Sequence, residues 1–264
     1  MNVYIHEMKS YSRSILMWSL SLASFSGLYI ILFSAMYSDI ESFKIVLLSL
    51  PEVVRRILSI YAESISTLEG FYSFVFLYLL LCGAIQAMNI GVSIISKEIR
   101  EKTADFLLTK PLSRTSILTY KLLAALSSIV ITNIIFFAIT IPMTFTVKQD
   151  FSMRTFLLIS ATLFFTQLIF AAIGVIISVI AGNIKSVTSV SLITVFGFFI
   201  ISSLGSIVSE QAVRYISPFQ YFDQPYIVKN AAYETRYLIT GLVITIISII
   251  ASYLIYIKKD IHTV

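Results

Sequence analysis

Six long apolar runs organise the chain, and its charged residues lie between them. None of the runs contains Asp, Glu, Lys or Arg, and they cover residues 15–37, 71–96, 122–147, 155–181, 186–209 and 237–257. Each run exceeds the roughly 20 residues that an α-helix needs to cross about 30 Å of hydrocarbon. We therefore expect an all-α polytopic membrane protein, with six transmembrane helices in a single transmembrane domain over residues 1–264.

The segments between the runs predict shorter elements near the membrane surface. Residues 1–14 mix apolar and polar positions in the manner of an interfacial helix. In residues 39–70 apolar residues recur at helical spacing and Pro51 interrupts them, which predicts one or two amphipathic helices on the outer face. The Gly182-Asn183 pair predicts a tight inner hairpin. The prolines and aromatics of residues 210–236 predict a partly embedded outer segment.

Composition excludes a soluble globular protein and a disulfide framework. Hydrophobic residues make up 58% of the 264 residues and charged residues 12%, which leaves too little polar surface for a water-soluble fold. The single cysteine, Cys82, lies inside an apolar run, so an internal disulfide cannot form. We read it as a small hydrophobic residue of a helix.

The distribution of charge indicates an orientation in the membrane and gives no reason to expect a nucleic acid partner. The basic residues are scattered over the ends of the apolar runs instead of forming one patch. With six spans, 11 of the 19 basic residues fall on the side of the two termini, and nine of the 14 acidic residues fall on the other side. By the positive-inside rule, both termini are expected to be cytoplasmic.

A charged segment over residues 97–116 joins the second and third runs on this cytoplasmic side. Thr103 to Thr109 can form about two helical turns, which Lys110-Pro111 would end, and Ser113 or Thr115 can cap the next helix. This short helix would present an apolar knob within a charged rim, as small docking sites do, with Phe106, Leu107 and Leu108 surrounded by Glu101, Asp105 and Arg114. An ordinary basic inner loop is the alternative.

Small and amide residues mark the second run. Gly83, Ala87 and Gly91 lie four residues apart and so share one helical face, where a neighbouring helix can pack closely. Gln86 and Asn89 form a polar stripe beside that face. Uncharged polar groups in a span either bond to adjacent helices or face a substrate path, and both alternatives stay open for these two residues.

The charged segment resembles the coupling helix of ABC type-2 permeases. That family has a Glu, then Gly-Thr-x-Glu-x-Leu-Leu, then Pro-x-x-Arg. The corresponding residues here are Glu98, Thr103, Asp105, Leu107, Leu108, Pro111 and Arg114. Lys102 stands where the family usually has Gly, and Asp105 where it usually has Glu.

The resemblance implies a permease subunit of an ABC transporter in a bacterial or archaeal cell membrane. It would work as a homodimer or heterodimer of permeases, surrounded by lipid, with two copies of a separate ABC ATPase that hold the ATP and Mg²⁺, while this chain binds no cofactor or metal. Spans two and five would line the path, and the direction of transport would be export. The uncharged amides Gln86 and Asn89, together with the aromatic-rich outer segment, suggest a hydrophobic or amphipathic substrate such as a peptide, lipid or antibiotic. The expected ATPase-docking residues are Glu98, Glu101, Lys102, Thr103, Asp105, Phe106, Leu107, Leu108 and Arg114.

Other functional classes have less support in the sequence. An ATPase is excluded because no GxxxxGK followed by Ser or Thr occurs. The histidines His6 and His262 lie in terminal segments without an HExxH motif, which argues against an intramembrane enzyme. Ion-coupled carriers usually place an acid or base within the membrane, and the six runs have none. An ion-coupled carrier and a structural or receptor-like membrane protein remain as alternatives.

Overall fold

The computed structural model describes residues 3–57, 65–100, 113–147, 150–181, 184–208 and 211–258. Most of these residues are helical, short turns and irregular stretches join the helices, and no strand occurs among the described residues. Six of the helices are long and apolar enough to cross a membrane, which confirms the expected all-α polytopic fold. The long helices are α1 (Val3–Met36), α4 (Leu68–Arg100), α6 (Arg114–Thr144), α7 (Met153–Ala181), α8 (Val187–Val208) and α11 (Thr235–Lys258).

The long helices extend beyond the apolar runs at most of their ends. α1 is one continuous helix, so the expected interfacial segment passes into the first span without a break. The position of residues 1–14 relative to a membrane surface stays a prediction. α4 and α6 likewise continue into the charged segment, because Lys, Glu and Arg are good helix formers once the chain leaves the hydrocarbon.

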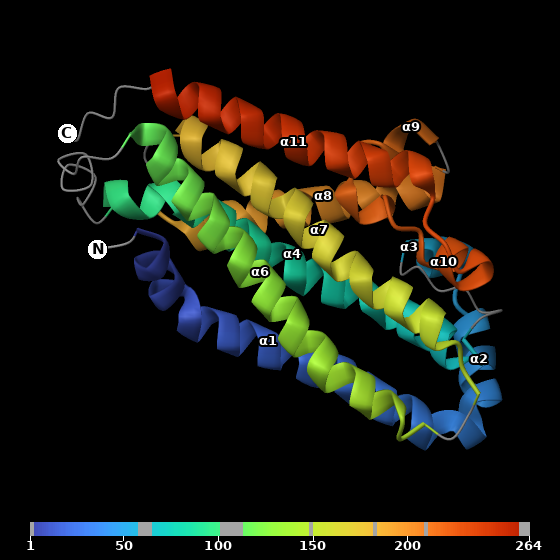
Figure 1. Cartoon of the computed structure of the whole chain (residues 1–264). Coiled ribbons are helices and arrows are strands. Elements are labelled where there is room, and N and C mark those ends of the chain that lie inside the picture. Colours follow the sequence, from blue (N-terminus) through green and yellow to red (C-terminus); the bar gives the residue numbers. More distant parts are fainter. Residues whose placement is uncertain are drawn as a thin grey trace.

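Short helices connect the spans at the end of the bundle away from Val3. They are η1 (Tyr37–Asp39), α2 (Ile40–Leu48), α3 (Glu52–Ile57), α9 (Gln211–Arg214), η2 (Pro218–Gln220) and α10 (Gln224–Asn230). The predicted helix break at Pro51 is confirmed, since α2 ends before this residue and α3 begins after it. At the other end, α4 and α7 end and α6 and α8 begin (Figure 1). Gly182 and Asn183, where the sequence predicts a tight hairpin, lie outside the described residues.

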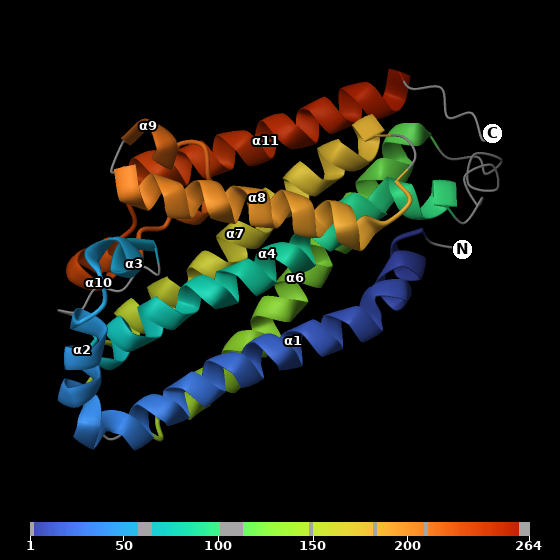
Figure 2. The ribbon, with the colours of Figure 1, turned by 180° about the vertical axis from the view of Figure 1, so that it is seen from behind.

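The spans are arranged around a central pair, α4 and α7, which make the most extensive helix contact of the described chain. α1 packs against α6 on one side of this pair, while α11 packs on α7 and α8 on α4. Seen from behind, α4 lies between α1 and α8 (Figure 2). The first turns of α1 and the last turns of α4 and α11 lie together, and we call this the terminal end of the bundle (Figure 1).

The central pair approaches closely because glycines face each other. A Cβ built on Gly91 would lie 2.3 Å from the Ala171 carbonyl oxygen and 3.0 Å from the Gly174 Cα. One built on Gly83 would lie 2.3 Å from the Leu163 Cδ1. Ala87, between these two glycines, is fully buried. The structure thus places all three small residues of the second span in the packed interior, with both glycines against α7.

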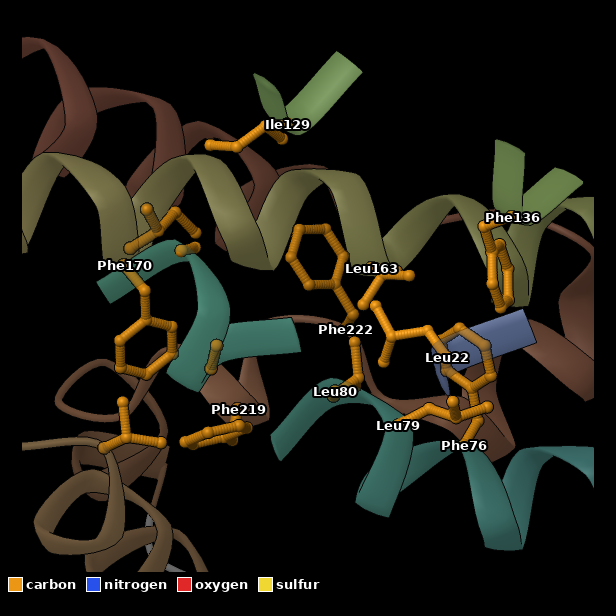
Figure 3. Close-up of a cluster of buried hydrophobic side chains, with 14 of the residues drawn as sticks. Leu22, Phe76, Leu79, Leu80, Ile129, Phe136, Leu163, Phe170, Phe219 and Phe222 are labelled. Atoms are coloured by element: carbon orange, nitrogen blue, oxygen red, sulfur yellow. The ribbon is translucent and has the colours of Figure 1, made fainter. Parts of the chain in front are cut away.

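Large apolar side chains fill the space around the central pair (Figure 3). Phe76 and Phe136 bring α4 and α6 into ring contact at 6.5 Å, and Phe170 joins α7 to η2 through Phe219 at 5.0 Å. Such edge and tilted ring pairs add to the packing that holds helices together in lipid, where burial of apolar surface from water gives no driving force.

Candidate functional site

Three amide side chains form a polar network in the middle of the bundle. Gln167 of α7 donates through Nε2 to the Gln86 Oε1 of α4 at 3.0 Å, and Gln86 donates to the Thr132 Oγ1 of α6 at 2.9 Å. The Asn133 Nδ2 donates to the Gln167 Oε1 at 2.6 Å and to the Ile129 carbonyl at 2.9 Å. The network links three spans without any ionised group.

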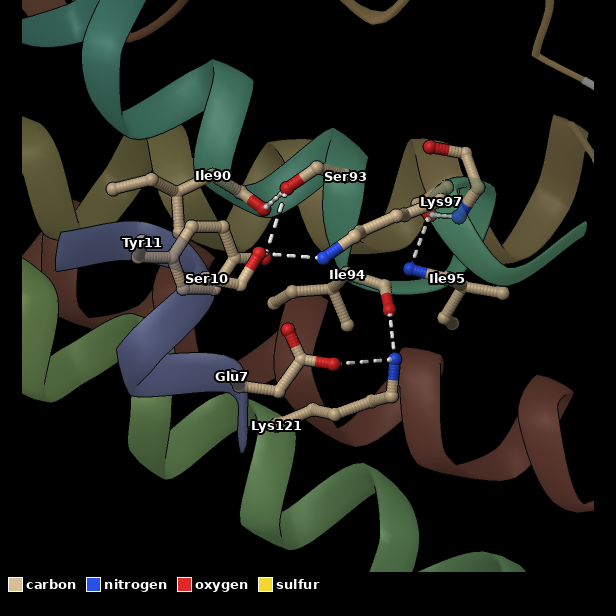
Figure 4. Close-up of polar contacts among 11 residues, drawn as sticks. Glu7, Ser10, Tyr11, Ile90, Ser93, Ile94, Ile95, Lys97 and Lys121 are labelled. Atoms are coloured by element: carbon tan, nitrogen blue, oxygen red, sulfur yellow. Dashed lines mark hydrogen bonds and ion pairs between the residues drawn. The ribbon is translucent and has the colours of Figure 1, made fainter. Parts of the chain in front are cut away.

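A second polar cluster lies at the terminal end, where the first turns of α1 meet α4 (Figure 4). The Lys97 Nζ donates to the Ser10 Oγ at 2.6 Å. The Tyr11 hydroxyl and the Ser93 Oγ share a hydrogen bond of 3.0 Å. These bonds fasten the N-terminal section of α1 to α4 at the point where the charged segment begins.

An ion pair fastens the same section of α1 to α6 (Figure 4). The Lys121 Nζ lies 3.5 Å from the Glu7 Oε1, and the two side chains are only 2% and 8% exposed. Lys121 also donates to the Ile94 carbonyl of α4. This ammonium group therefore contacts two other helices, α1 and α4. We call the residues of this cluster the polar junction: Glu7, Ser10, Tyr11, Ser93, Ile94, Lys97 and Lys121.

Glu7 and Lys121 are functional candidates that the sequence pattern alone does not single out. A signal for Glu7 was present, because Val3, Glu7 and Tyr11 recur at intervals of four and so share one helical face. For Lys121 the sequence signal is weaker. It immediately precedes an apolar run, where a long basic side chain more commonly reaches out to the membrane surface.

Most of the expected docking residues lie outside the described residues. They are Glu101, Lys102, Thr103, Asp105, Phe106, Leu107 and Leu108. Glu98 belongs to α4. Arg114 is the first residue of α6, and its guanidinium donates to the Ile257 carbonyl of α11 at 3.4 Å. Their part in ATPase docking stays a prediction.

The start of α6 is well defined in the structure. The Ser113 Oγ accepts a hydrogen bond from the Ser116 amide at 3.2 Å, which confirms Ser113 as the predicted cap. One turn further, the Thr119 hydroxyl and the Tyr253 hydroxyl of α11 share a hydrogen bond of 2.7 Å. The chain that leaves the charged segment therefore enters a helix held by neighbouring spans.

A sequence model described as the ABC-2 family transporter protein matches residues 1–261, almost the whole chain. The chain belongs to this family. It is thus an ABC transporter permease, the membrane subunit of such a transporter, and associates with an ABC ATPase subunit. No curated protein and no solved structure matches it.

The two amides of the expected substrate path have different surroundings in the permease. Gln86 is 1% exposed and bonded to Thr132 and Gln167, contacts that agree with helix-to-helix bonding. Asn89 is half-buried on α4, and its Oδ1 has no hydrogen-bond partner among the described residues. Asn89 is thus the more exposed of the two side chains, although its Oδ1 is itself buried.

At the opposite end of the bundle, charged residues of the permease stabilise the connection between α8 and α11. The Arg214 Nη2 lies 2.9 Å from the Glu234 Oε1, and its guanidinium lies 4.1 Å from the centre of the Tyr237 ring. Burial raises the pKa of the Asp223 carboxyl, although the nearby Arg214 acts in the opposite direction. The raised pKa means that the folded chain disfavours the carboxylate form of Asp223.

Proposed function

We propose that the permease exports a hydrophobic or amphipathic substrate, such as a peptide, a lipid or an antibiotic. The energy comes from ATP hydrolysed on two copies of the ATPase subunit, which hold the nucleotide and its Mg²⁺. Two permease subunits, alike or unlike, form the membrane part of the transporter.

The arrangement at the terminal end carries the proposal. α4 ends and α6 begins beside the first turns of α1, and the polar junction ties the three helices together there. Residues 97–116 thus connect two helices that run to the opposite end of the bundle. A force applied by an ATPase at such a connection would act on several spans together, because packed helices shift as units.

Charge supports a cytoplasmic position for this end. The described basic residues at the terminal end are Lys9, Arg13, Lys97, Arg100, Arg114, Lys121, Lys185 and Lys258. The opposite end carries most of the acidic residues that the structure describes. The positive-inside rule then places both termini and the ATPase on the cytoplasmic side of a bacterial or archaeal membrane.

An exposed apolar face of α8 supports contact with a second permease copy. The amide on the neighbouring α4 supports a substrate path along these two helices. On α8, Ile193 is 75% exposed, and a Cβ built on Gly197 would meet no atom within 4 Å. A small residue with open space beside it allows a helix of another subunit to approach closely. The uncharged amide of Asn89 on α4 suits a substrate that carries few formal charges.

The docking role is tested in a complex purified through a tagged ATPase subunit. Leu107→Asp and Asp105→Arg are expected to reduce the copurified permease and the ATP turnover that it stimulates. Loss of a central interface residue costs about 2 kcal/mol or more, or about thirtyfold in affinity.

Asp150→Arg is the matched control, because Asp150 is exposed at the opposite end of the bundle. It should leave both measurements unchanged. If Leu107→Asp and Asp105→Arg insert normally and retain full copurification and turnover, residues 97–116 do not dock the ATPase.

A further inference from the structure

The Glu7–Lys121 ion pair is buried, and stability alone does not account for it. Its two side chains are 8% and 2% exposed, so both charged groups are largely removed from water. Replacement of a buried ion pair by apolar residues of similar volume is often neutral or stabilising, whereas buried polar groups are well attested as devices that fix one arrangement of helices. A role in positioning therefore explains the pair better.

Lys121 has a geometry that suits this role. A lysine next to a membrane surface can extend its stem and place the ammonium group in water. Here the ammonium group instead turns inward, contacts Glu7 of α1 and donates to the Ile94 carbonyl of α4. One side chain of α6 thus holds two other helices at a defined distance.

The remaining contacts of this section of α1 follow the same face. The Tyr4 hydroxyl donates to the Ser127 Oγ at 3.0 Å, and the Ser128 Oγ lies 3.8 Å from the Met8 sulfur. Tyr4, Glu7, Met8 and Tyr11 follow the i, i+3, i+4, i+7 spacing of one helical face, so they lie on one side of α1. That side lies between α4 and α6, with the ion pair at its centre.

We propose that Glu7 and Lys121 are positioning residues that join the first turns of α1 to α4 and α6, so that the three helices move as one body when the transporter works. The inference rests on the proposed function, because it assumes that an ATP-driven movement reaches α4 and α6. It goes further by assigning α1 to the moving unit and by naming the two side chains that keep it there.

Spin labels can measure whether α1 follows α6. Cysteines replace Ile5 on α1 and Ile134 on α6, which are 62% and 61% exposed, in a Cys82→Ala background that removes the single native thiol. Distances between the labels are recorded by pulsed electron paramagnetic resonance in the purified complex with the ATPase. With the Glu7–Lys121 ion pair intact, the two labels should give one narrow distance distribution. This distribution should be the same without nucleotide and after trapping with ATP and vanadate.

Loss of the ion pair should allow α1 to move independently of α6. Glu7→Gln is expected to broaden the distribution and to make it differ between the two states. Lys121→Arg keeps a cationic donor and should preserve the narrow distribution. Glu41→Gln is the matched control, because Glu41 forms a weak pair of 3.9 Å with Lys44 at the opposite end and is 71% exposed. It should behave as the unmodified protein does.

Specific results would overturn the inference. A narrow, state-independent distribution in Glu7→Gln would show that the ion pair does not hold α1. If Glu7→Gln fails to fold, the apolar pair Glu7→Met with Lys121→Met restores packing without charge, and a narrow distribution there would equally refute the positioning role. Failure of the unmodified chain to copurify with an ATPase would count against the proposed function instead.

Discussion

The contact between α4 and α7 at Gly91 makes a quantitative prediction. A Cβ at this position would lie 2.3 Å from the Ala171 carbonyl oxygen and 3.0 Å from both the Gly174 Cα and the Val175 amide nitrogen. All three obstacles are backbone atoms, which cannot rotate away as a side-chain tip can. Since a close carbon-to-oxygen contact measures about 3.3 Å, Gly91→Ala has to move the two helices apart by roughly 1 Å.

The size of the effect follows from what this separation disturbs. Overpacking of this kind costs about 1–3 kcal/mol. Gln86 lies about 7.5 Å along α4 from Gly91, and its 3.0 Å bond to Gln167 would stretch beyond hydrogen-bonding distance, at a cost of about 0.6 kcal/mol. The better helix propensity of Ala returns up to about 1 kcal/mol. We expect a net loss of about 1–3 kcal/mol in the free energy of unfolding.

Gly83→Ala is the matched comparison on the same two helices. A Cβ there would also lie 2.3 Å from α7, but the obstacle is the Cδ1 of Leu163, the end of a side chain that can turn. The assay heats the detergent-purified permease and measures, by size-exclusion chromatography, the temperature at which half of the intact particle is lost. Gly91→Ala should lower this temperature by about 3–10 °C and Gly83→Ala by clearly less. Equal losses, or a larger loss for Gly83→Ala, would refute the backbone argument.

Two further predictions use the same assay. Gln167→Leu removes the acceptor of the Asn133 hydrogen bond and the donor of the hydrogen bond to Gln86, so it should lower the stability by about 1–2 kcal/mol. An unchanged stability would mean that the amide network does not stabilise the bundle. Asp223→Asn should raise stability at pH 7, because the raised pKa of Asp223 shows that the carboxylate form disfavours folding. This gain should vanish as the pH falls well below the ordinary carboxyl pKa of 3.8, where Asp223 is protonated in folded and unfolded chains alike. If Asp223→Asn and the unmodified protein are equally stable at every pH, the pKa of Asp223 is not raised by folding.

The fold was predictable because the membrane imposes a simple rule on the sequence. Backbone groups in hydrocarbon must bond within their own helix, so each long uncharged run had to become a span, and six such helices are present. The helix ends were less predictable. Lys97 and Arg114 are compatible with helix and loop alike, and only the cap at Ser113 and the packing of neighbouring spans define where α6 begins.

Parts of the candidate site depend on contacts between residues distant in sequence. The intervals of four among Gly83, Ala87 and Gly91 indicated a close contact without naming the partner, which is α7. Two roles were open for Gln86, because the sequence does not reveal whether an amide faces a neighbouring helix or a substrate path. Glu7 and Lys121 are 114 positions apart, and nothing local to either residue reveals that the other neutralises its charge.

The depths of the two polar clusters follow the cost of burying each kind of group. A charged side chain is most costly at the centre of a bilayer and much less so near its surface, and Lys121 lies within the first two or three turns of α6, near the terminal end. In the middle of the bundle the chain uses neutral amides, whose hydrogen bonds satisfy them at a cost of desolvation far below that of an ion. The amides can therefore hold α4, α6 and α7 together in the middle of the hydrocarbon, whereas the ionic contact can specify the position of α1 only at the end where ATP-driven force would enter. This division separates the groups that maintain the bundle from the pair that we infer positions its moving part.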